Sequence, residues 1–355
     1  MVPLAREVKY VSLEDFRGPF FLAGDIGGTN SNFGIFSLEY QEPVLLISLH
    51  YKSRDVLEFA VFMQEVIGYI ESKYGITFEK GCIGAAGIIY PTRIWVKPTN
   101  LSFEINLSDV IHLTSFKKLL LINDFEAVAL GVELLKPSDI VTVHKGHGYT
   151  RANKGFLGAG TGLGKSILSW GVESNRYLPI VSEGGHADAC FYPPETELMN
   201  FLYAISHHNP VSWEDILSGA GIQKIYRFLG TLKKYPLTEA TLEIERTDFN
   251  PDRISFYAQH DARSRDTFTL YIKLYARCAK NFALDALTLN GLYIAGGIAA
   301  KNISMFFDPL FRQEFIRCQK HNKKVQQIPI HIIANYNVSL YGAIVADRLH
   351  EQNLL

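Results

Sequence analysis

A glycine-rich segment near the amino terminus combines a carboxylate with a turn that could bind phosphate. Residues 24–30 read Gly-Asp-Ile-Gly-Gly-Thr-Asn and lie between two apolar runs, 19–24 and 33–38, that predict strands. Adjacent glycines can adopt positive φ, so that successive backbone N–H groups face an anion. Asp25 adds a carboxylate that could hold Mg²⁺, directly or through water. An unliganded hairpin turn is the alternative, but the whole pattern after a buried strand favours phosphate binding.

A second glycine-rich segment, residues 158–166, reads Gly-Ala-Gly-Thr-Gly-Leu-Gly-Lys-Ser and predicts another phosphate-binding turn. Its end also fits a loose P-loop pattern, which requires a helix directly after the loop. Residues 167–172 instead alternate and contain a glycine, which predicts a strand, so the P-loop interpretation is disfavoured. Lys165 could contact a phosphate or be a solvated lysine, and the sequence does not separate the two.

An Asn-Asp pair ends the most apolar predicted strand of the chain, Leu119–Ile122, and opens a predicted helix at 125–135. In open α/β sheets, ligands bind beyond the carboxyl ends of the strands. A carboxylate in such a partly dry position can have a raised pKa and act as a general base. Helix capping by Asn123 or Asp124 is the alternative, and the two phosphate turns favour catalysis.

Three further segments carry polar or flexible residues after predicted strands or before helices. Glu183 and His186 flank a Gly-Gly turn that could present both side chains to a polyhydroxylated ligand, and a metal site there is disfavoured. Glu214 precedes a Ser-Gly-Ala-Gly turn, and taken alone it favours a cap or a surface acid. Gly296 and Gly297 follow an apolar run, which suits close approach by a flat ring such as adenine, or a tight turn.

The elements that must position these residues alternate between strand and helix, which indicates an α/β fold. Apolar residues recur at helical spacing over 55–74, and further helices are predicted at 195–207, 219–230, 266–288 and 338–350. Residues 1–18 are interpreted as an extension before the first strand, and residues 231–262 as a polar, irregular insertion. The two halves share one layout of strand, glycine-rich turn, strand, strand and helices, which predicts a cleft between them.

Composition excludes several classes of protein. The chain has 355 residues, of which 47% are hydrophobic and 20% charged, so a core is expected. Lys and Arg total 35 against 36 Asp and Glu, which argues against a nucleic-acid partner. The basic run 317–324 is interpreted as a solvated helix end. Scattered cysteines, and the lack of a signal sequence or a long apolar run, predict a cytoplasmic protein without a membrane partner.

Taken in order, the motifs D-x-G-G-T-N, N-D-F, G-A-G-T-G-L-G, E-G-G-H, E-x-x-L-S-G and A-G-G-I resemble the bacterial-type ATP-dependent glucokinase family. This family belongs to the hexokinase/actin/Hsp70-like superfamily, and the resemblance covers about residues 20–350. It implies a kinase, a transferase of glycolysis, with two ribonuclease-H-like (actin-like ATPase) α/β domains around a hinged cleft. The small domain would be 1–134 plus 338–355, and the large domain 135–337. A homodimer is also implied.

The resemblance implies a role for each matching residue. Asp124 would be the general base that accepts the proton of the sugar 6-hydroxyl. The sugar-hydroxyl ligands would be Asn100, Asn123, Glu183, His186 and Glu214. ATP would be bound by Gly27, Gly28, Thr29 and Asn30, by Gly160, Thr161 and Gly162, and by Gly296 and Gly297. Changing Glu183 or Glu214 to Ala is then expected to weaken chiefly glucose binding.

The sequence departs from the pattern of this family at several positions. Ser31-Asn32 stands where the family often has a small residue followed by Arg, which removes one charge near the phosphates. Phe103 stands where Trp is frequent, and Lys165 replaces an apolar residue. A kinase for another hexose, such as mannose or an N-acetylhexosamine, therefore stays open. So do a non-catalytic actin- or Hsp70-like ATP switch and, as the least favoured alternative, a P-loop NTPase.

Overall fold

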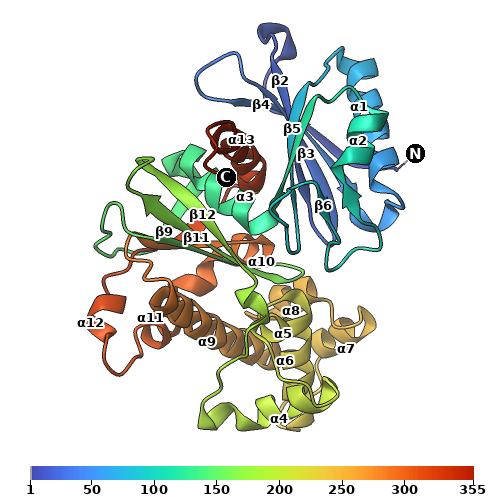
Figure 1. Cartoon of the computed structure of the whole chain (residues 1–355). Coiled ribbons are helices and arrows are strands. Elements are labelled where there is room, and N and C mark those ends of the chain that lie inside the picture. The colour runs from blue at the N-terminus through green and yellow to red at the C-terminus, as the bar shows by residue number, and fades with distance from the viewer. Residues whose placement is uncertain (1) are drawn as a thin grey trace. The chain divides into compact units, whose positions relative to one another are not determined.

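The computed structural model describes residues 2–355, and the chain divides into two compact units (Figure 1). Unit 1 comprises Met1–Asp139, Trp170–Val181 and Asn335–Leu355, and unit 2 comprises Ile140–Ser169 and Ser182–Ala334. The sequence-based bounds placed 170–181 in the large domain, whereas this segment groups with unit 1. Those bounds stay a prediction. Within residues 2–355, no helix is both long and apolar enough to cross a membrane.

Unit 1 is built on a six-stranded sheet in which three consecutive strands are parallel. Its order is β1 (Leu4–Lys9), β4 (Val44–Lys52), β3 (Asn30–Ser37), β2 (Phe20–Ile26), β5 (Lys80–Ala85) and β8 (Lys118–Asn123). The register aligns Ile26 with Ala85, and Ala85 with Asn123. The carboxyl ends of β2, β5 and β8 therefore meet at one edge, where two of the predicted motifs begin.

Helices cover both faces of this sheet (Figure 1). α1 (Phe59–Tyr74) and α2 (Leu107–Leu113) pack on one face, and α3 (Asp124–Gly131) and α13 (Val338–Glu351) on the other. The apolar spacing that predicted a helix over 55–74 is confirmed, although the helix begins at Phe59. It ends at Gly75 with φ of 66°, a left-handed conformation that glycine adopts without strain. The short strands β6 (Trp95–Val96) and β7 (Ile105–Asn106) form a separate hairpin.

α3 and α13 pack against each other with almost no space between their backbones. A Cβ atom on Gly342 would lie 1.7 Å from the Ala127 carbonyl oxygen, and one on Gly131 would lie 1.9 Å from the Val338 carbonyl oxygen. Both positions therefore accept only glycine. The carboxyl-terminal helix thereby fixes the helix that begins at Asp124.

The amino-terminal segment is not the extension that the sequence suggested. Leu4–Lys9 forms β1, which pairs antiparallel with β4 at the edge of the sheet. The Glu7 carboxylate accepts hydrogen bonds from Tyr69 and Tyr74 of α1 and pairs with Lys73 at 2.9 Å. Desolvation opposes ionisation of Glu7, but these donors outweigh it and lower its pKa from 4.5 to about 2.

We expect Glu7→Gln to lower the free energy of unfolding by about 1–2 kcal/mol at pH 7, a value reduced to allow for solvent screening. A carboxylate with a depressed pKa stabilises the fold above its unfolded-state pKa, and this contribution disappears as the pH falls through the folded-state value. The difference from wild type in urea unfolding should therefore shrink between pH 4.5 and pH 2. Glu14→Gln, at an exposed position, is the control. A difference that does not change with pH would refute this assignment.

Unit 2 contains strands of a second six-stranded sheet, in which five strands follow the same order as five strands of the first and the sixth lies at the opposite edge. The order is β12 (Arg176–Ser182), β11 (Leu163–Gly171), β10 (Lys154–Ala159), β13 (Gly291–Ala295), β14 (Ile330–Ile333) and β9 (Ile140–His144). β10 is antiparallel to β11 and parallel to β13, as β2 is to β3 and β5. The shared layout predicted from the sequence is confirmed. The ribonuclease-H-like assignment stays a prediction.

The helices of unit 2 form most of its core. They are α4 (Thr196–Ile205), α5 (Trp213–Ile216), α6 (Gly219–Thr231), α7 (Glu239–Arg246), α8 (Pro251–Tyr257), α9 (Ala262–Asp285), α10 (Gly297–Lys301), α11 (Pro309–Phe315) and α12 (Asn322–Val325). The expectation of an irregular segment over 231–262 is wrong, because α7 and α8 occupy much of it. Ile244 and Ile254 of these helices are fully buried. A few apolar residues at helical spacing suffice here because α6 and α9 supply the packing surface.

Candidate active site

The first glycine-rich segment forms the tight turn between β2 and β3. The Gly27 N–H donates to the Asn30 carbonyl at 3.0 Å, which closes the hairpin. The turn follows Ile26 at the sheet edge where β8 also ends, so it lies at the same edge as Asn123 and Asp124. This is the edge at which open α/β sheets bind ligands.

Ser53, a buried serine directly after β4, holds this turn in place. The Ser53 hydroxyl donates to the Gly27 carbonyl at 2.6 Å, and the Ser53 N–H donates to the Thr29 carbonyl at 3.1 Å. The Ser31 and Ser53 hydroxyls are 2.9 Å apart. With both carbonyls already satisfied, the turn keeps one shape. The sequence analysis missed Ser53, because nothing in its local sequence marks it.

Lys52 brings a cation to the first glycine-rich turn. Its ammonium donates to the Asn30 Oδ1 at 2.8 Å, and Asn30 and Lys52 are directly opposite in the β3–β4 register. Asn32, where Arg is frequent in the similar family, instead directs its amide oxygen to the His50 Nδ1 at 2.8 Å. The positive charge at this turn therefore comes from a neighbouring strand.

Asp25 occupies the penultimate position of β2 and accepts a hydrogen bond from the Ser339 hydroxyl of α13 at 2.8 Å. Burial raises the pKa of Asp25, and hydrogen bonds from Ser339 and Asn32 only partly oppose that effect. Its ionised form is therefore costly unless a cation is nearby. Within residues 2–355, no group of three or more His, Cys, Asp or Glu side chains could hold a metal ion.

Asn123 and Asp124 occupy the junction between β8 and α3. The Asn123 Oδ1 accepts from the backbone N–H groups of Phe125 (2.9 Å) and Glu126 (3.2 Å), and its Nδ2 donates to the Gly87 carbonyl at 3.1 Å. Asn123 is therefore the N-cap of α3, as the capping alternative proposed. One Nδ2 hydrogen has no role in these bonds and stays compatible with a sugar contact.

Asp124 is the first residue of α3 and is half-buried. Its Oδ1 accepts from the Phe125 N–H at 2.9 Å. A carboxylate in this position is stabilised by the N-terminal end of the helix dipole. Gly84 lies beside it, because a Cβ there would be 3.8 Å from the Asp124 Cα and 3.3 Å from the Ala127 Cβ. The small residue on β5 allows the start of α3 to sit close to the sheet.

A buried ion pair braces the same junction. Glu126 accepts the Asn123 N–H at 3.2 Å, which completes a capping box, and it forms a two-pronged pair with Arg93 at 3.1 Å for each contact. The Glu126 side chain is only 1% exposed, so the pair is well shielded from water. The N-x-x-E spacing of Asn123 and Glu126 was a readable sign of this cap. Arg93, 33 residues away, had none.

Asn100 lies on an exposed turn between β6 and β7. Its side chain makes no hydrogen bond within residues 2–355, so its predicted sugar role stays a prediction. Phe103, close by, is buried and stacks on Phe59 of α1 with ring centroids 6.1 Å apart. The replacement of a frequent Trp by Phe is thus accommodated inside the core of unit 1.

In unit 2, the second glycine-rich segment forms the turn between β10 and β11. The Gly160 N–H donates to the Gly162 carbonyl at 2.8 Å, and the Gly160 carbonyl accepts from the Gly219 N–H at 3.0 Å. β11 begins at Leu163, so a strand follows the turn and a P-loop is excluded. Lys165 is neither solvated nor part of the turn. It is only 6% exposed, and its ammonium lies 5.6 Å from the Phe282 ring centroid.

The predicted sugar ligands of unit 2 come together beside this turn. The His186 Nε2 lies 3.7 Å from the Glu183 Oε2, and its Nδ1 lies 3.9 Å from the Glu214 Oε1. They meet because the Ala189 N–H donates to the Val211 carbonyl and the Trp213 N–H donates to the Ala187 carbonyl. This pairing joins two segments that are distant in sequence.

Glu214 also contacts the second glycine-rich turn itself. Its Oε2 accepts the Leu163 N–H at 2.8 Å, and a Cβ on Gly162 would lie 2.5 Å from the same oxygen. Gly162 therefore leaves the space that this carboxylate fills. Glu214 thus links the predicted sugar ligands to the second glycine-rich turn, a contact that its residue type and spacing did not predict.

The Gly296-Gly297 pair lies next to the second turn. Gly296 has φ of 89°, and a Cβ there would be 2.4 Å from the Ala159 carbonyl oxygen, so only glycine fits. Gly297 begins α10, and nothing lies within 4 Å of its Cβ position. Gly158 pairs with Ala295, which places both glycine turns at the carboxyl ends of adjacent parallel strands. The open face of Gly297 is where a flat ring could approach.

Comparison with solved structures defines the class of protein as a two-domain sugar kinase. A glucokinase from an Antarctic psychrotroph aligns with a TM-score of 0.75 and 25% identity over 94% of this chain and all of that one. A glucokinase from Balamuthia mandrillaris, in complex with glucose, aligns with a TM-score of 0.77 and 21% identity over 92% of this chain and 93% of that one.

The sequence itself matches the glucokinase family over residues 22–350, so the chain belongs to the glucokinase family. The glucokinase of Trichormus variabilis is 32% identical over 346 residues, which cover 92% of this chain and 99% of that protein. The glucokinase of Psychromonas ingrahamii is 31% identical over 91% of this chain. The resemblance drawn from the motifs is thereby confirmed at the level of the family.

Proposed function

We propose that this protein transfers the γ-phosphoryl group of ATP to the 6-hydroxyl of glucose, with Asp124 as the general base. Membership of the glucokinase family and the pairing of Glu183, His186 and Glu214 beside a glycine-rich turn carry the proposal. Carboxylates and a histidine suit the hydroxyl groups of a neutral sugar. A solved glucokinase of the ROK family from Streptomyces griseus, with TM-score 0.65, contains glucose and AMPPNP.

The residues of this chain fit a magnesium nucleotide. Asp25 is a half-buried carboxylate with a raised pKa, and it lies just before the first glycine-rich turn, so a nearby cation would favour its ionised form. Magnesium is usually held by one or two carboxylates together with substrate phosphates and water. When bound, it would neutralise charge on the transferring phosphoryl group. The turns at 27–30 and 160–162 would hold the phosphates, and Gly297 the adenosine.

In phosphoryl transfer, the residues of the protein would position the two substrates and accept one proton from the sugar. Asp124, fixed by the α3 N-terminus, would orient the 6-hydroxyl and take its proton as the hydroxyl oxygen attacks phosphorus. Glu183, His186 and Glu214 would hold the other hydroxyls of the same glucose molecule. Exclusion of water from the bound substrates would keep ATP from being simply hydrolysed.

ADP formation with Mg·ATP, measured against glucose, mannose, fructose, N-acetylglucosamine and no sugar, tests this function. Turnover should be greatest with glucose and very low without sugar. Strongest turnover with another sugar would keep the phosphoryl transfer and reassign the substrate. Equal ADP formation with and without sugar would instead favour an actin- or Hsp70-like ATP switch.

We expect Lys52→Met to raise the KM for Mg·ATP about five- to tenfold, with a smaller effect on kcat, because the first phosphate turn loses its cation. Arg54→Met is a matched control two residues away. The Arg54 side chain is 85% exposed and lies 3.6 Å from Asp55, away from the turn bonds. Equal changes in the two variants would show that Lys52 has no particular role at the phosphates.

A further inference from the structure

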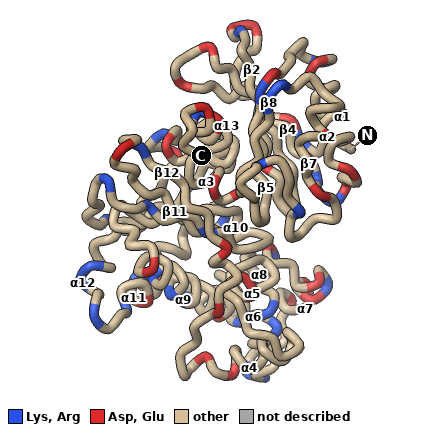
Figure 2. Tube along the Cα trace, viewed as in Figure 1, with Lys and Arg blue, Asp and Glu red and all other residues tan. Residues whose placement is uncertain are grey.

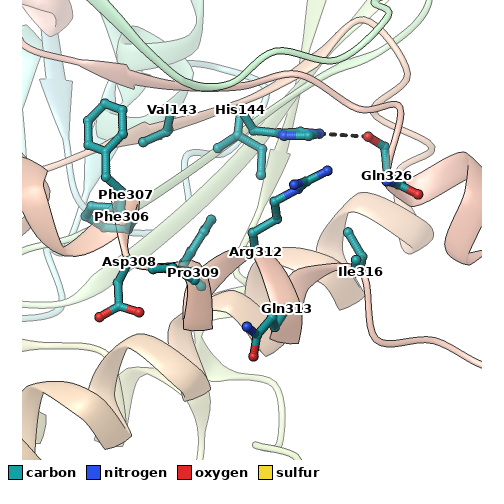
Figure 3. A pocket seen from close by; sticks show the side chains of 12 residues that line it. Val143, His144, Phe306, Phe307, Asp308, Pro309, Arg312, Gln313, Ile316 and Gln326 are labelled. Atoms are coloured by element: carbon teal, nitrogen blue, oxygen red, sulfur yellow. Dashed lines mark hydrogen bonds between the residues drawn. The ribbon is translucent and has the colours of Figure 1, made fainter.

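A cavity of about 470 Å³ lies within unit 2, and none of the residues proposed for catalysis lines it (Figure 3). Its floor is apolar and is formed largely by Val143 of β9, Phe306, Phe311 of α11 and Ile316. Phe306 and Phe311 are buried, and their ring centroids are 5.3 Å apart. The floor is therefore part of the packed core and not a set of loose surface side chains.

A second cavity of about 460 Å³ adjoins the first and is basic. The two cavities share His144, Arg312 and Gln326. The second is lined in addition by Lys145, Gly146, His147, Lys323 and Gln327, and none of its lining residues is acidic. The continuous surface thus has an apolar half and a cationic half, joined at Arg312.

The cations of this surface have no anionic partner among the residues that the structure describes. Within residues 2–355, the side chains of Lys145, Arg312 and Lys323 form no ion pair or hydrogen bond. Figure 3 shows the Arg312 guanidinium directed toward His144 and Gln326, and the Asp308 carboxylate directed away from them. Asp308 is engaged elsewhere, since it accepts the Leu310 N–H at 2.8 Å. Figure 2 shows the basic residues of α12, which are Lys323 and Lys324.

Other contacts hold the cationic half in shape. The His144 Nε2 lies 2.7 Å from the Gln326 carbonyl oxygen, to which it donates, and the His147 N–H donates to the Gln327 carbonyl at 2.6 Å. A Cβ on Gly146 would lie 2.1 Å from that same Gln327 carbonyl oxygen. The 144–147 segment is therefore fixed against 326–327. The run 317–324, interpreted from sequence as a solvated helix end, contributes Lys323 to this surface.

The strand register separates this surface from the nucleotide turns. His144 pairs with Ile330, the first residue of β14, so the surface lies at the amino end of the parallel strands. The turns at 160–162 and 296–297 follow the carboxyl ends of β10 and β13. The two sites are at opposite ends of one sheet.

We propose that the joined cavities bind a small organic phosphate monoester with an apolar body. The cationic half carries two lysines, one arginine and two histidines. This set suits a phosphate group with two negative charges better than a group with one. The aromatic floor would receive the apolar body, as in other small-molecule sites that combine apolar lining with a few placed polar groups. This is a binding site separate from the glucose and ATP sites.

Calorimetric titration of the full chain with 1-naphthyl phosphate tests the proposal. We expect binding with a Kd below about 1 mM, weakened about tenfold or more in the Arg312→Gln/Lys323→Gln double variant. Lys320→Gln removes an exposed cation of the same region that does not line either cavity, and should bind within about twofold of wild type. Turnover of glucose should be unchanged in both variants, which would show that each is folded.

Two further titrations test the two halves separately. Inorganic phosphate should bind at least about tenfold more weakly than 1-naphthyl phosphate, because it leaves the apolar floor empty. 1-Naphthoate should also bind more weakly, because it carries one charge. The proposal would be overturned if inorganic phosphate or 1-naphthoate bound as tightly as 1-naphthyl phosphate. It would also be overturned if the wild type and the double variant bound 1-naphthyl phosphate with equal affinity. The absence of heat with 1-naphthyl phosphate up to about 5 mM would overturn it too.

Discussion

Asp124→Asn should lower kcat by about 10²–10⁴-fold while glucose binding is largely kept. The variant removes the proton acceptor but retains an oxygen that can accept the Phe125 N–H, so the start of α3 should be unchanged. The N-cap of the helix, Asn123, is also untouched. The loss should therefore appear in the chemical step and not in folding or substrate affinity.

Steady-state kinetics, calorimetric titration with glucose and thermal unfolding together measure this outcome. Asp109→Asn is the matched control, since it neutralises an exposed acid in the first turn of α2 within the same unit. It should leave kcat within about twofold of wild type. Near wild-type turnover of Asp124→Asn would remove the general base from the mechanism and leave Asp124 as a helix-terminal acid.

Changing Glu183 and Glu214 to Ala should have different consequences, although the sequence assigned them one role. Glu183 approaches only His186 among the predicted sugar ligands, so Glu183→Ala should weaken glucose binding and leave ATP binding nearly unchanged. Glu214 also accepts the Leu163 N–H beside Gly162. Glu214→Ala should lower kcat/KM for glucose about 10²-fold and also raise the KM for Mg·ATP several-fold.

Parallel titrations with glucose and with Mg·ADP separate the two residues. Glu197→Ala, an exposed acid on α4, is the control and should affect neither ligand. If Glu214→Ala left nucleotide binding intact, the hydrogen bond from the Leu163 N–H to Glu214 would have no role in binding the nucleotide. If Glu183→Ala weakened both ligands equally, its assignment to the sugar would be wrong.

Local sequence was sufficient for most strands and for the long helices. The apolar runs before residues 25, 123 and 159 predicted β2, β8 and β10, because a strand that is covered on both faces has no polar face. The glycine pairs were equally readable. Gly296 adopts positive φ against the Ala159 carbonyl, a conformation and a space that exclude any side chain.

Segments that depend on a partner surface were misjudged. β1 carries charged residues and has little strand pattern, yet it pairs with β4 and is held by tyrosines more than 60 residues away. α7 and α8 are short and polar, and they form because α6 and α9 provide an apolar surface. In such segments, tertiary packing outweighs local propensity.

The candidate site divides in the same way. The sequence by itself determined which residue types stand at these positions, and from them it predicts a base after β8, two glycine turns for phosphates, and acids and a histidine for hydroxyl groups. Only the tertiary structure decided which residues hold these groups in place. Ser53 and Lys52 bind the first turn, Arg93 binds Glu126, and Glu214 accepts the Leu163 N–H. Residue type limits what a side chain can do. Its partners depend on contacts between distant segments, which form only when the sheets and helices pack.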